Sequence, residues 1–213
     1  MRLVLRNIKI RDDAEYKLEN ASFTFEEGKV YGLTGGSERL RKLLAEFISE
    51  RTSAGSGDVI IDRTSGFKNA VRRNSAVILE EAAFPDNVSV SEYCAVYGKI
   101  HNVSDLSHIE ECLKTVDLYE RRDDAAGKLK REERIKLQLA LMIMYCPEII
   151  IASDLSCYCS EYFGKFTGRV KDGHIIILFS EDSEELCKIT DEIVAIDNGC
   201  LMTVNMSGGT YVK

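Results

Sequence analysis

Hydrophobic and polar residues alternate along the first third of the chain, as they do in β-strands that bury one face. The alternation covers residues 3–5, 21–25 and 30–33. Residues 26–29, between the last two of these segments, read Glu-Glu-Gly-Lys, and we interpret them as a tight hairpin turn. The chain is therefore predicted to begin with antiparallel strands.

A helical period follows the turn formed by Gly35, Gly36 and Ser37. Apolar residues recur at the spacing of one helix face, at Leu40, Leu43, Leu44, Phe47 and Ile48. Ser37 is a suitable N-cap, and Glu38 lies in the first turn, where the helix dipole favours negative charge. The sequence thus predicts a strand, a glycine turn and a helix, a unit that is common in phosphate-binding folds.

Strands and helices are both predicted in the rest of the chain. Strand patterns occupy residues 55–62, 75–79, 148–152 and 174–179. The last two are continuous apolar runs, which suit central strands of a parallel sheet covered on both faces. Residues 89–146 are predicted to be mainly helical, with polar breaks near 102–104 and 123–124. This order predicts an α/β fold with an antiparallel β start, a βα unit, a helical insertion and a final βαβ segment.

Composition restricts the class of protein. The chain has 213 residues, of which 45% are hydrophobic and 30% charged, as in one globular domain with a sizeable core. A net charge of −7 argues against a nucleic-acid partner, which usually binds a basic face. No apolar run approaches the roughly 20 residues of a membrane span. Charge appears too early at the N-terminus for a signal peptide, so we expect a cytoplasmic protein.

The cysteines and histidines suggest no site of their own. Seven cysteines are scattered in mostly apolar surroundings, which in a reducing cytosol indicates core residues rather than disulfides. Cys157 and Cys159 form a pair, but no second pair or nearby histidine completes a metal site, and none is predicted. The dispersed His101, His108 and His174 are interpreted as surface or strand-edge residues.

Five segments together carry a more specific resemblance: residues 18–33, 56–62, 79–92, 137–151 and 183–199. The first leads into the glycine turn, and the fourth ends in the apolar strand Ile149-Ile150-Ile151. In this order the segments resemble the ABC-transporter ATPase family over essentially the whole chain. The resemblance implies a P-loop NTPase-like ABC ATPase core with an N-terminal antiparallel β-subdomain and an α-helical subdomain. It implies one domain over 1–213, with the helical subdomain at roughly 86–133.

The phosphate loop of that family, G-x-x-x-x-G-K-[ST], is degenerate here. The corresponding nucleotide-binding positions are Gly35, Gly36, Ser37, Glu38 and Arg39. Such a loop binds phosphate through backbone amides, a lysine and a hydroxyl that reaches Mg²⁺. Here it is about three residues too short, a serine stands at the lysine position and Glu38 replaces the hydroxyl. The nearby cations Arg39, Arg41 and Lys42 are expected to point away from the helix N-terminal amides. We interpret the stretch as a turn without a ligand.

The carboxylates and the switch residue of the family's catalytic site are also altered. The resemblance implies a Walker B aspartate for Mg²⁺ followed by a glutamate that orients water. Here Ser153 and Asp154 occupy those positions, and Asp154 is one methylene shorter than the usual base. Glu80 stands at the Q-loop glutamine, where it retains the capacity to bind a metal. Glu181 replaces the switch histidine.

The signature motif of the family, L-S-G-G-Q, is replaced as well. The corresponding residues are Leu129, Lys130, Arg131, Glu132 and Glu133. Both glycines are missing, and two carboxylates stand where the resemblance implies that an anion docks. We interpret residues 131–134 as a solvated helix face with i, i+4 charge pairing.

The leading hypothesis is a catalytically defective ABC-type subunit with a structural or regulatory role and no bound cofactor. The resemblance implies an ABC permease as its partner, contacted near residues 84–97, and a second nucleotide-binding subunit or copy of itself. It would then lie at the inner face of the membrane. One alternative is a divergent ATP-binding subunit that handles Mg²⁺ and ATP weakly through Glu80, Asp154 and helix amides. The weakest hypothesis is a dinucleotide-binding turn at residues 32–36, because its glycines do not have the G-x-G-x-x-G spacing of such turns.

Overall fold

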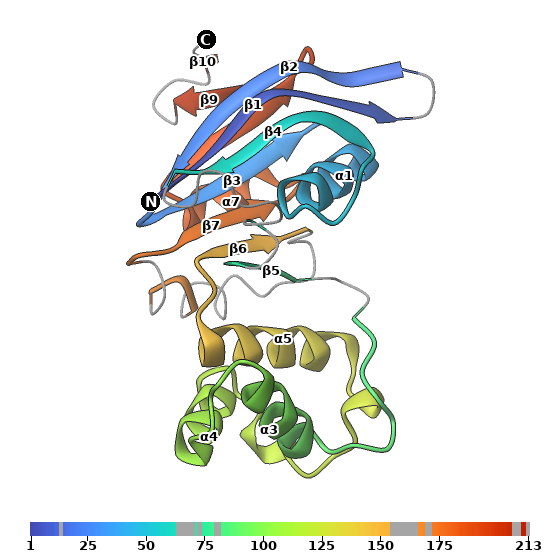
Figure 1. Ribbon diagram of the computed structural model, residues 1–213, viewed down its shortest axis with the longest axis vertical. Coiled ribbons are helices and arrows are strands. Elements are labelled where there is room, and N and C mark those ends of the chain that lie inside the picture. The colour runs from blue at the N-terminus through green and yellow to red at the C-terminus, as the bar shows by residue number, and fades with distance from the viewer. Residues whose placement is uncertain are drawn as a thin grey trace. The chain divides into compact units, whose positions relative to one another are not determined.

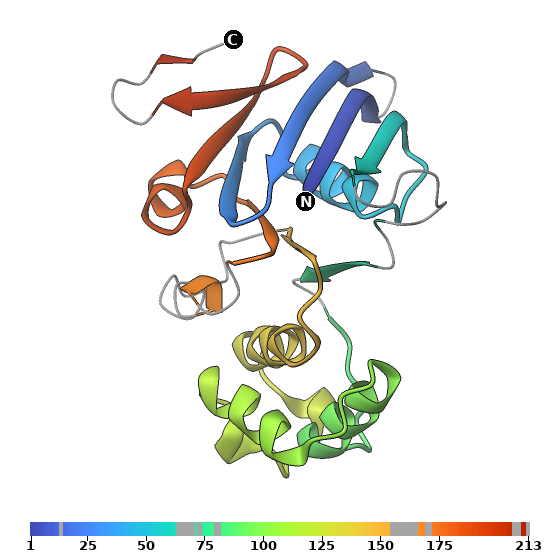
Figure 2. The ribbon, with the colours of Figure 1, turned by 60° about the vertical axis from the view of Figure 1, so that its left-hand side comes forward.

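The computed structural model describes residues 1–12, 15–62, 71, 74–78, 82–153, 166–168, 172–205 and 210–211. The chain forms two compact units. The first unit comprises Met1–Val77, Glu148–Ser156 and Lys171–Lys213, and the second comprises Ile78–Pro147 and Cys157–Val170 (Figures 1 and 2). Within the described ranges, no helix is long and apolar enough to cross a bilayer.

A three-stranded antiparallel sheet lies in the first unit. Its order is β2 (Glu15–Glu26), β1 (Arg2–Asp12) and β4 (Gly55–Ile61). Leu3 and Leu5 are buried, but the buried positions then change to Ile8 and Ile10. The register shifts at Asn7, whose φ of 52° interrupts the regular strand. The extra residue therefore keeps one apolar face of a long strand on the core.

The other sheet of the first unit has seven strands, in the order β10-β9-β8-β3-β7-β6-β5. The strands are β3 (Lys29–Gly35), β5 (Ser75–Ile78), β6 (Ile149–Ala152), β7 (Ile175–Phe179), β8 (Glu192–Asp197), β9 (Cys200–Asn205) and β10 (Thr210–Tyr211). β3 pairs in parallel with both β7 and β8, and β6 pairs in parallel with β7. Every residue of β6 and β7 is buried, so the predicted central parallel strands are confirmed.

The turn predicted between the second and third strands is present, but it does not form a hairpin. β2 pairs with β1 in one sheet, whereas both edges of β3 are occupied by β7 and β8 in the other. The N–H of Gly28, whose φ is +80°, donates to the carbonyl of His174, next to the start of β7. The turn therefore carries the chain from one sheet to the next, and the hairpin interpretation is wrong.

Two helices cover different parts of the sheets in the first unit. α1 (Glu38–Ile48) contacts β1 and β3 through the predicted apolar stripe, in which Leu40, Leu44, Phe47 and Ile48 are buried and Leu43 is half-buried. α7 (Ser183–Ile189) contacts β3 and β8 (Figure 1). A Cβ on Gly32 would lie 2.8 Å from the end of the Ile193 side chain and 3.2 Å from Cβ of Leu186 on α7, so a larger residue would force α7 or its side chains to shift.

The second unit is helical, which confirms the prediction for residues 89–146. It contains α3 (Val90–Ile100), α4 (Leu106–Thr115), α5 (Arg131–Tyr145) and two short 3₁₀ turns, η1 (Tyr119–Arg121) and η2 (Ala126–Lys128). The breaks after α3 and around 123–124 fall where polar residues predicted them. The unit extends beyond the range 86–133 expected for a helical subdomain. The mixed α/β class is confirmed.

The cysteine prediction is correct for only part of the chain. Cys94 and Cys112 are buried in the second unit, and burial raises the pKa of the Cys94 thiol to about 12. Cys146, Cys187 and Cys200 are free thiols at exposed positions, so they are not core residues. Cys157 and Cys159 lie outside the described residues.

Candidate functional site

The turn between β3 and α1 requires its two glycines. Gly35 has a φ of +83° and Gly36 a φ of +62°, both in the left-handed region that favours glycine. A Cβ on Gly35 would lie 2.7 Å from the carbonyl oxygen of Ile196 on β8. Ser37 ends the turn as the N-cap of α1, as predicted, and its Oγ accepts a hydrogen bond from the Leu40 N–H at 3.1 Å. Serine and glycines together thus define the helix start.

The side chain of Arg41 folds back onto this turn. Its Nη1 donates to the carbonyl of Gly36 at 3.0 Å and to that of Gly35 at 3.3 Å. The side chain is only 8% exposed. The cations of α1 were expected to point away from the helix N-terminal amides, and Arg41 bonds instead to carbonyls of the turn before the helix. Side chains on a helix lean toward its N-terminus, and the guanidinium at the fourth helical position is long enough to reach the preceding turn.

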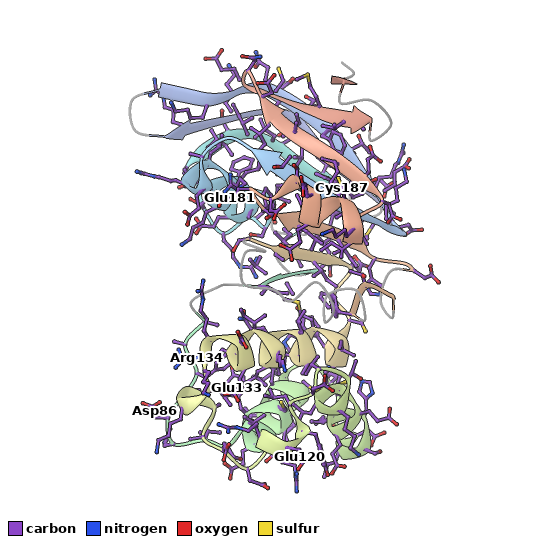
Figure 3. All side chains as sticks on the ribbon, turned by 180° about the vertical axis from the view of Figure 1, so that it is seen from behind. Asp86, Glu120, Glu133, Arg134, Glu181 and Cys187 are labelled. Atoms are coloured by element: carbon purple, nitrogen blue, oxygen red, sulfur yellow. The ribbon has the colours of Figure 1, made fainter. Side chains whose placement is uncertain are left out.

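Glu181 lies next to this arginine. Its Oε2 is 3.7 Å from Nη2 of Arg41, an ion pair in which the carboxylate side chain is 79% exposed. Glu181 follows the end of β7, and Figure 3 labels it near α1. Its neighbour Ser180 is buried, and its N–H donates to the Leu33 carbonyl at 3.1 Å. Ser180 Oγ also accepts from the Asp182 N–H, so the backbone that carries Glu181 is fixed on both sides.

The remaining loop residues are directed toward solvent. Gly36, Ser37, Glu38 and Arg39 are exposed. Glu38 is the acidic residue of the first turn of α1. The structure therefore brings the turn and Glu181 together through Arg41, which the sequence suggested only as one of three cations near the loop.

The signature-equivalent residues begin α5 in the second unit. Leu129 is buried, Lys130 is the N-cap, and Arg131 and Glu132 are exposed in the first helical turn. Glu133 folds back, and its Oε2 accepts a hydrogen bond from the Lys130 N–H at 2.8 Å. A carboxylate of the chain itself thus caps this helix end, where the favourable electrostatics for an anion are found.

Two arginines hold the same segment. Nε of Arg121 lies 3.5 Å from the Glu133 carboxylate. Arg134 donates to the carbonyls of Leu129 at 2.9 Å and Gly127 at 2.7 Å (Figure 3). The sequence predicted a solvated helix face over residues 131–134. Residues 131 and 132 are exposed to solvent, as that prediction requires. The prediction fails for Glu133 and Arg134, because both are half-buried and bond to the backbone that precedes the helix.

Two of the predicted site residues cannot be placed. Asp154 and Glu80 lie outside the described residues. Ser153, which precedes Asp154, directly follows the buried strand β6 and is half-buried. The structure thus gives a geometry for the turn, for Glu181 and for residues 129–133, but not for the carboxylates at the Q-loop and Walker B positions.

A row of aromatic rings on the second unit was also not predicted. Ring centroids are 5.2 Å apart in Phe84–Tyr93, 6.4 Å in Tyr93–Tyr97, 4.5 Å in Tyr97–His101 and 4.1 Å in His101–Tyr145. Tyr93, Tyr97 and His101 recur at i, i+4 and i+8 along α3 and its C-cap, a signal that the sequence contained. His101 is half-buried in this row rather than a plain surface residue, and burial lowers its pKa.

We compared the chain with known proteins by sequence and by structure. No family model matches the chain. A protein of Streptococcus agalactiae serotype V, named as an ABC transporter ATP-binding protein, is 22% identical over 214 aligned positions, which cover 94% of this chain but only 38% of that protein. The chain therefore spans less than half the length of this relative.

Two solved structures are similar to this chain. One is a bacterial Atm1-family ABC exporter with ATP bound, with a TM-score of 0.77 and 15% identity over 94% of this chain and 37% of that chain. The other is an ATP-binding subunit of an ABC transporter, with a TM-score of 0.80 and 16% identity over 97% of this chain and 90% of that chain. The chain thus has the fold of the ATP-binding domains of ABC transporters, and its sequence similarity to one such protein extends over nearly its whole length.

Proposed function

We propose that this chain is an ABC-type ATP-binding-domain homologue that does not turn over ATP and serves as a structural or regulatory subunit of a membrane transporter. One observation carries the proposal. The guanidinium of Arg41 is bonded to the carbonyls of Gly35 and Gly36, at the turn where an active member of the family would hold the phosphates of ATP.

The donor groups at this turn are a poor match to a magnesium-bound triphosphate. A phosphate loop needs several amides, a lysine and a hydroxyl directed at the ligand. Here the Ser37 hydroxyl accepts from a helix amide, and Glu38 places a negative charge in the first turn of α1. Like charges repel, and the Glu38 side chain is exposed where a phosphate would approach. These features support the loss of nucleotide binding.

The signature position supports the same proposal from the second unit. In an active dimer this helix end would face the terminal phosphate of a nucleotide held by the partner subunit. Here the Glu133 carboxylate is bonded to the Lys130 N–H, and Arg121 and Arg134 hold the surrounding segment. Docking a phosphate there would require displacing the chain's own carboxylate, at the cost of a charge-assisted hydrogen bond.

We further propose that a membrane permease binds the second unit around residues 84–97. Phe84, Tyr93 and Tyr97 form a continuous row of ring contacts there. Val96 and Ile100, on an adjoining face of α3, are 56% and 70% exposed. Aromatic and aliphatic side chains of this kind are the usual anchors of protein interfaces. The chain would then act at the cytoplasmic face of the membrane, paired with a second nucleotide-binding subunit or with a copy of itself.

Calorimetric titration with Mg·ATP tests the loss of nucleotide binding. We expect no saturable heat at nucleotide concentrations up to the millimolar range and no phosphate release. ADP, ATP without Mg²⁺ and NAD in parallel titrations serve as controls. A dissociation constant tighter than roughly 100 μM, about −5.5 kcal/mol of binding free energy, would contradict the proposal. It would favour a divergent ATP-binding subunit, and Glu80→Gln and Asp154→Asn would then identify the ligand-binding carboxylates.

A further inference from the structure

The ion pair between Arg41 and Glu181 has an unusual distribution of exposure. The arginine side chain is 8% exposed, and the glutamate side chain is 79% exposed. The guanidinium also bonds to two backbone carbonyls, which are neutral and leave its charge uncompensated. The Glu181 carboxylate, 3.7 Å away, supplies negative charge on the solvent side.

A buried cation of this kind needs an anion. Removing a charge from water is costly unless an opposite charge or several hydrogen bonds compensate for it. Arg41 is held by the carbonyls of Gly35 and Gly36, so it cannot move out to the surface without breaking both bonds. Nη2 of Arg41 therefore stays in place as a positively charged donor. Either a carboxylate or a phosphate group can form an ion pair with it.

We propose that Glu181 is an internal anion that occupies the position against Arg41 and thereby excludes phosphate-type anions from the turn after β3. The inference rests on the proposed function, because it explains how the turn stays free of nucleotide. Glu181 is thus a specificity-determining residue: its carboxylate does what a bound phosphate would do, and it repels other anions. If Glu181 only linked β7 to α1 structurally, removing its charge would not change the affinity of the turn for anions.

Titration with inorganic pyrophosphate at fixed ionic strength tests this role. The variants are Glu181→Gln, which keeps the shape and removes the charge, and Glu184→Gln, which removes the same charge from an exposed position on α7. We expect E181Q to bind pyrophosphate about two- to fivefold more tightly than the wild type, the upper part of the range expected for one largely exposed charge pair. E184Q should match the wild type.

A double variant shows whether the new affinity depends on the arginine. E181Q combined with Arg41→Met should lose the gain in pyrophosphate affinity, with folding checked by circular dichroism. If that protein does not fold, the comparison of E181Q with E184Q still decides the question. The inference is overturned if E181Q binds pyrophosphate no more tightly than the wild type, or if E184Q gains as much.

The two proposals fail in distinguishable ways. Tight binding of Mg·ATP by the wild-type chain contradicts the proposed function, whatever the variants do. Absence of a gain in E181Q, together with a wild type that binds no ATP, contradicts the role of Glu181 alone.

Discussion

At the scale of single residues, the most informative side chain is one that motif comparison passes over. Gly35, Gly36 and Ser37 are identifiable from the sequence because a glycine turn and an N-cap have local signatures. Arg41 has none: it is one of several cations on α1, and its direction depends on how the turn packs against β8 and β7. The local sequence therefore predicted the turn, but not that the Arg41 guanidinium bonds to its carbonyls.

Replacing Arg41 should destabilise the first unit. Arg41→Met removes two hydrogen bonds to backbone carbonyls and an ion pair, and it leaves Glu181 without this partner. We expect a loss of about 1–3 kcal/mol in the free energy of unfolding, the range for leaving backbone acceptors without their hydrogen-bond donor, because the remaining Glu181 carboxylate is exposed to water. Urea denaturation followed by circular dichroism measures it.

Lys42→Met is the matched control, since it removes the same charge from the exposed next residue of α1. Its cost should stay within about 0.5 kcal/mol. Equal losses in the two variants would show that Arg41 is not a structural partner of the turn.

At the scale of elements, prediction succeeded where a segment's own pattern decides its structure. The stripe from Leu40 to Ile48 and the apolar run in β6 each determine their element and its buried face. The hairpin before β3 was wrong because residues 26–29 encode a turn but not the sheet that receives the next strand. That choice depends on β7 and β8, which come more than a hundred residues later.

The start of α3 allows a test at this scale. Ser89 Oγ accepts from the Glu92 N–H, and the backbone N–H and hydroxyl of Ser89 both donate to the Glu92 carboxylate. The bond from the Ser89 backbone N–H, and then the bond from its hydroxyl, lower the pKa of the Glu92 carboxyl below its ordinary value of 4.5. A lowered pKa in the folded state stabilises the fold above the unfolded pKa, and this contribution is lost as the pH falls through the folded value.

Ser89→Ala removes the hydroxyl bond but keeps the backbone N–H bond, so the pKa of Glu92 should rise only part of the way toward 4.5, as measured by NMR titration of its carboxyl carbon. Loss of the N-cap should also cost about 1 kcal/mol of stability near neutral pH. Ser104→Ala, in the loop between α3 and α4, should change neither quantity. A Ser89→Ala variant with both the Glu92 pKa and the stability of the wild type would rule out a role for the Ser89 hydroxyl in this cap.

At the scale of the whole molecule, the fold is that of an ATP-binding subunit, whereas the site supports our proposal that the chain does not use ATP. The similarity to ATP-binding subunits extends over nearly the whole chain, whereas the positions that we propose as equivalents of the phosphate loop and the signature hold the chain's own charged side chains. A scaffold can be kept for its contacts when its chemistry is not used. Contacts with a permease are then the property to measure.

Val96→Glu should weaken binding to the permease without changing stability, because Val96 is 56% exposed on α3. Co-purification with a permease encoded in a neighbouring gene provides the measurement. We expect at least about a tenfold loss of affinity if this face lies at the centre of the interface. Lys99→Gln lowers the net charge by the same amount at another exposed position of α3 and should bind normally. Unchanged binding by V96E would place the interface elsewhere.

The arginine in the turn has a consequence for the lifetime of the protein in a cell. A protein that binds ATP in its folded state gains stability by mass action, and it loses that gain when the adenylate pool is depleted. Here the turn is closed by covalently attached groups, Arg41 and Glu181, whose local concentration never changes. If the chain binds no ATP, as we propose, starvation leaves its folded fraction, and its exposure to proteases, unaltered. A transporter of the proposed kind then keeps one subunit whose abundance is independent of the energy charge.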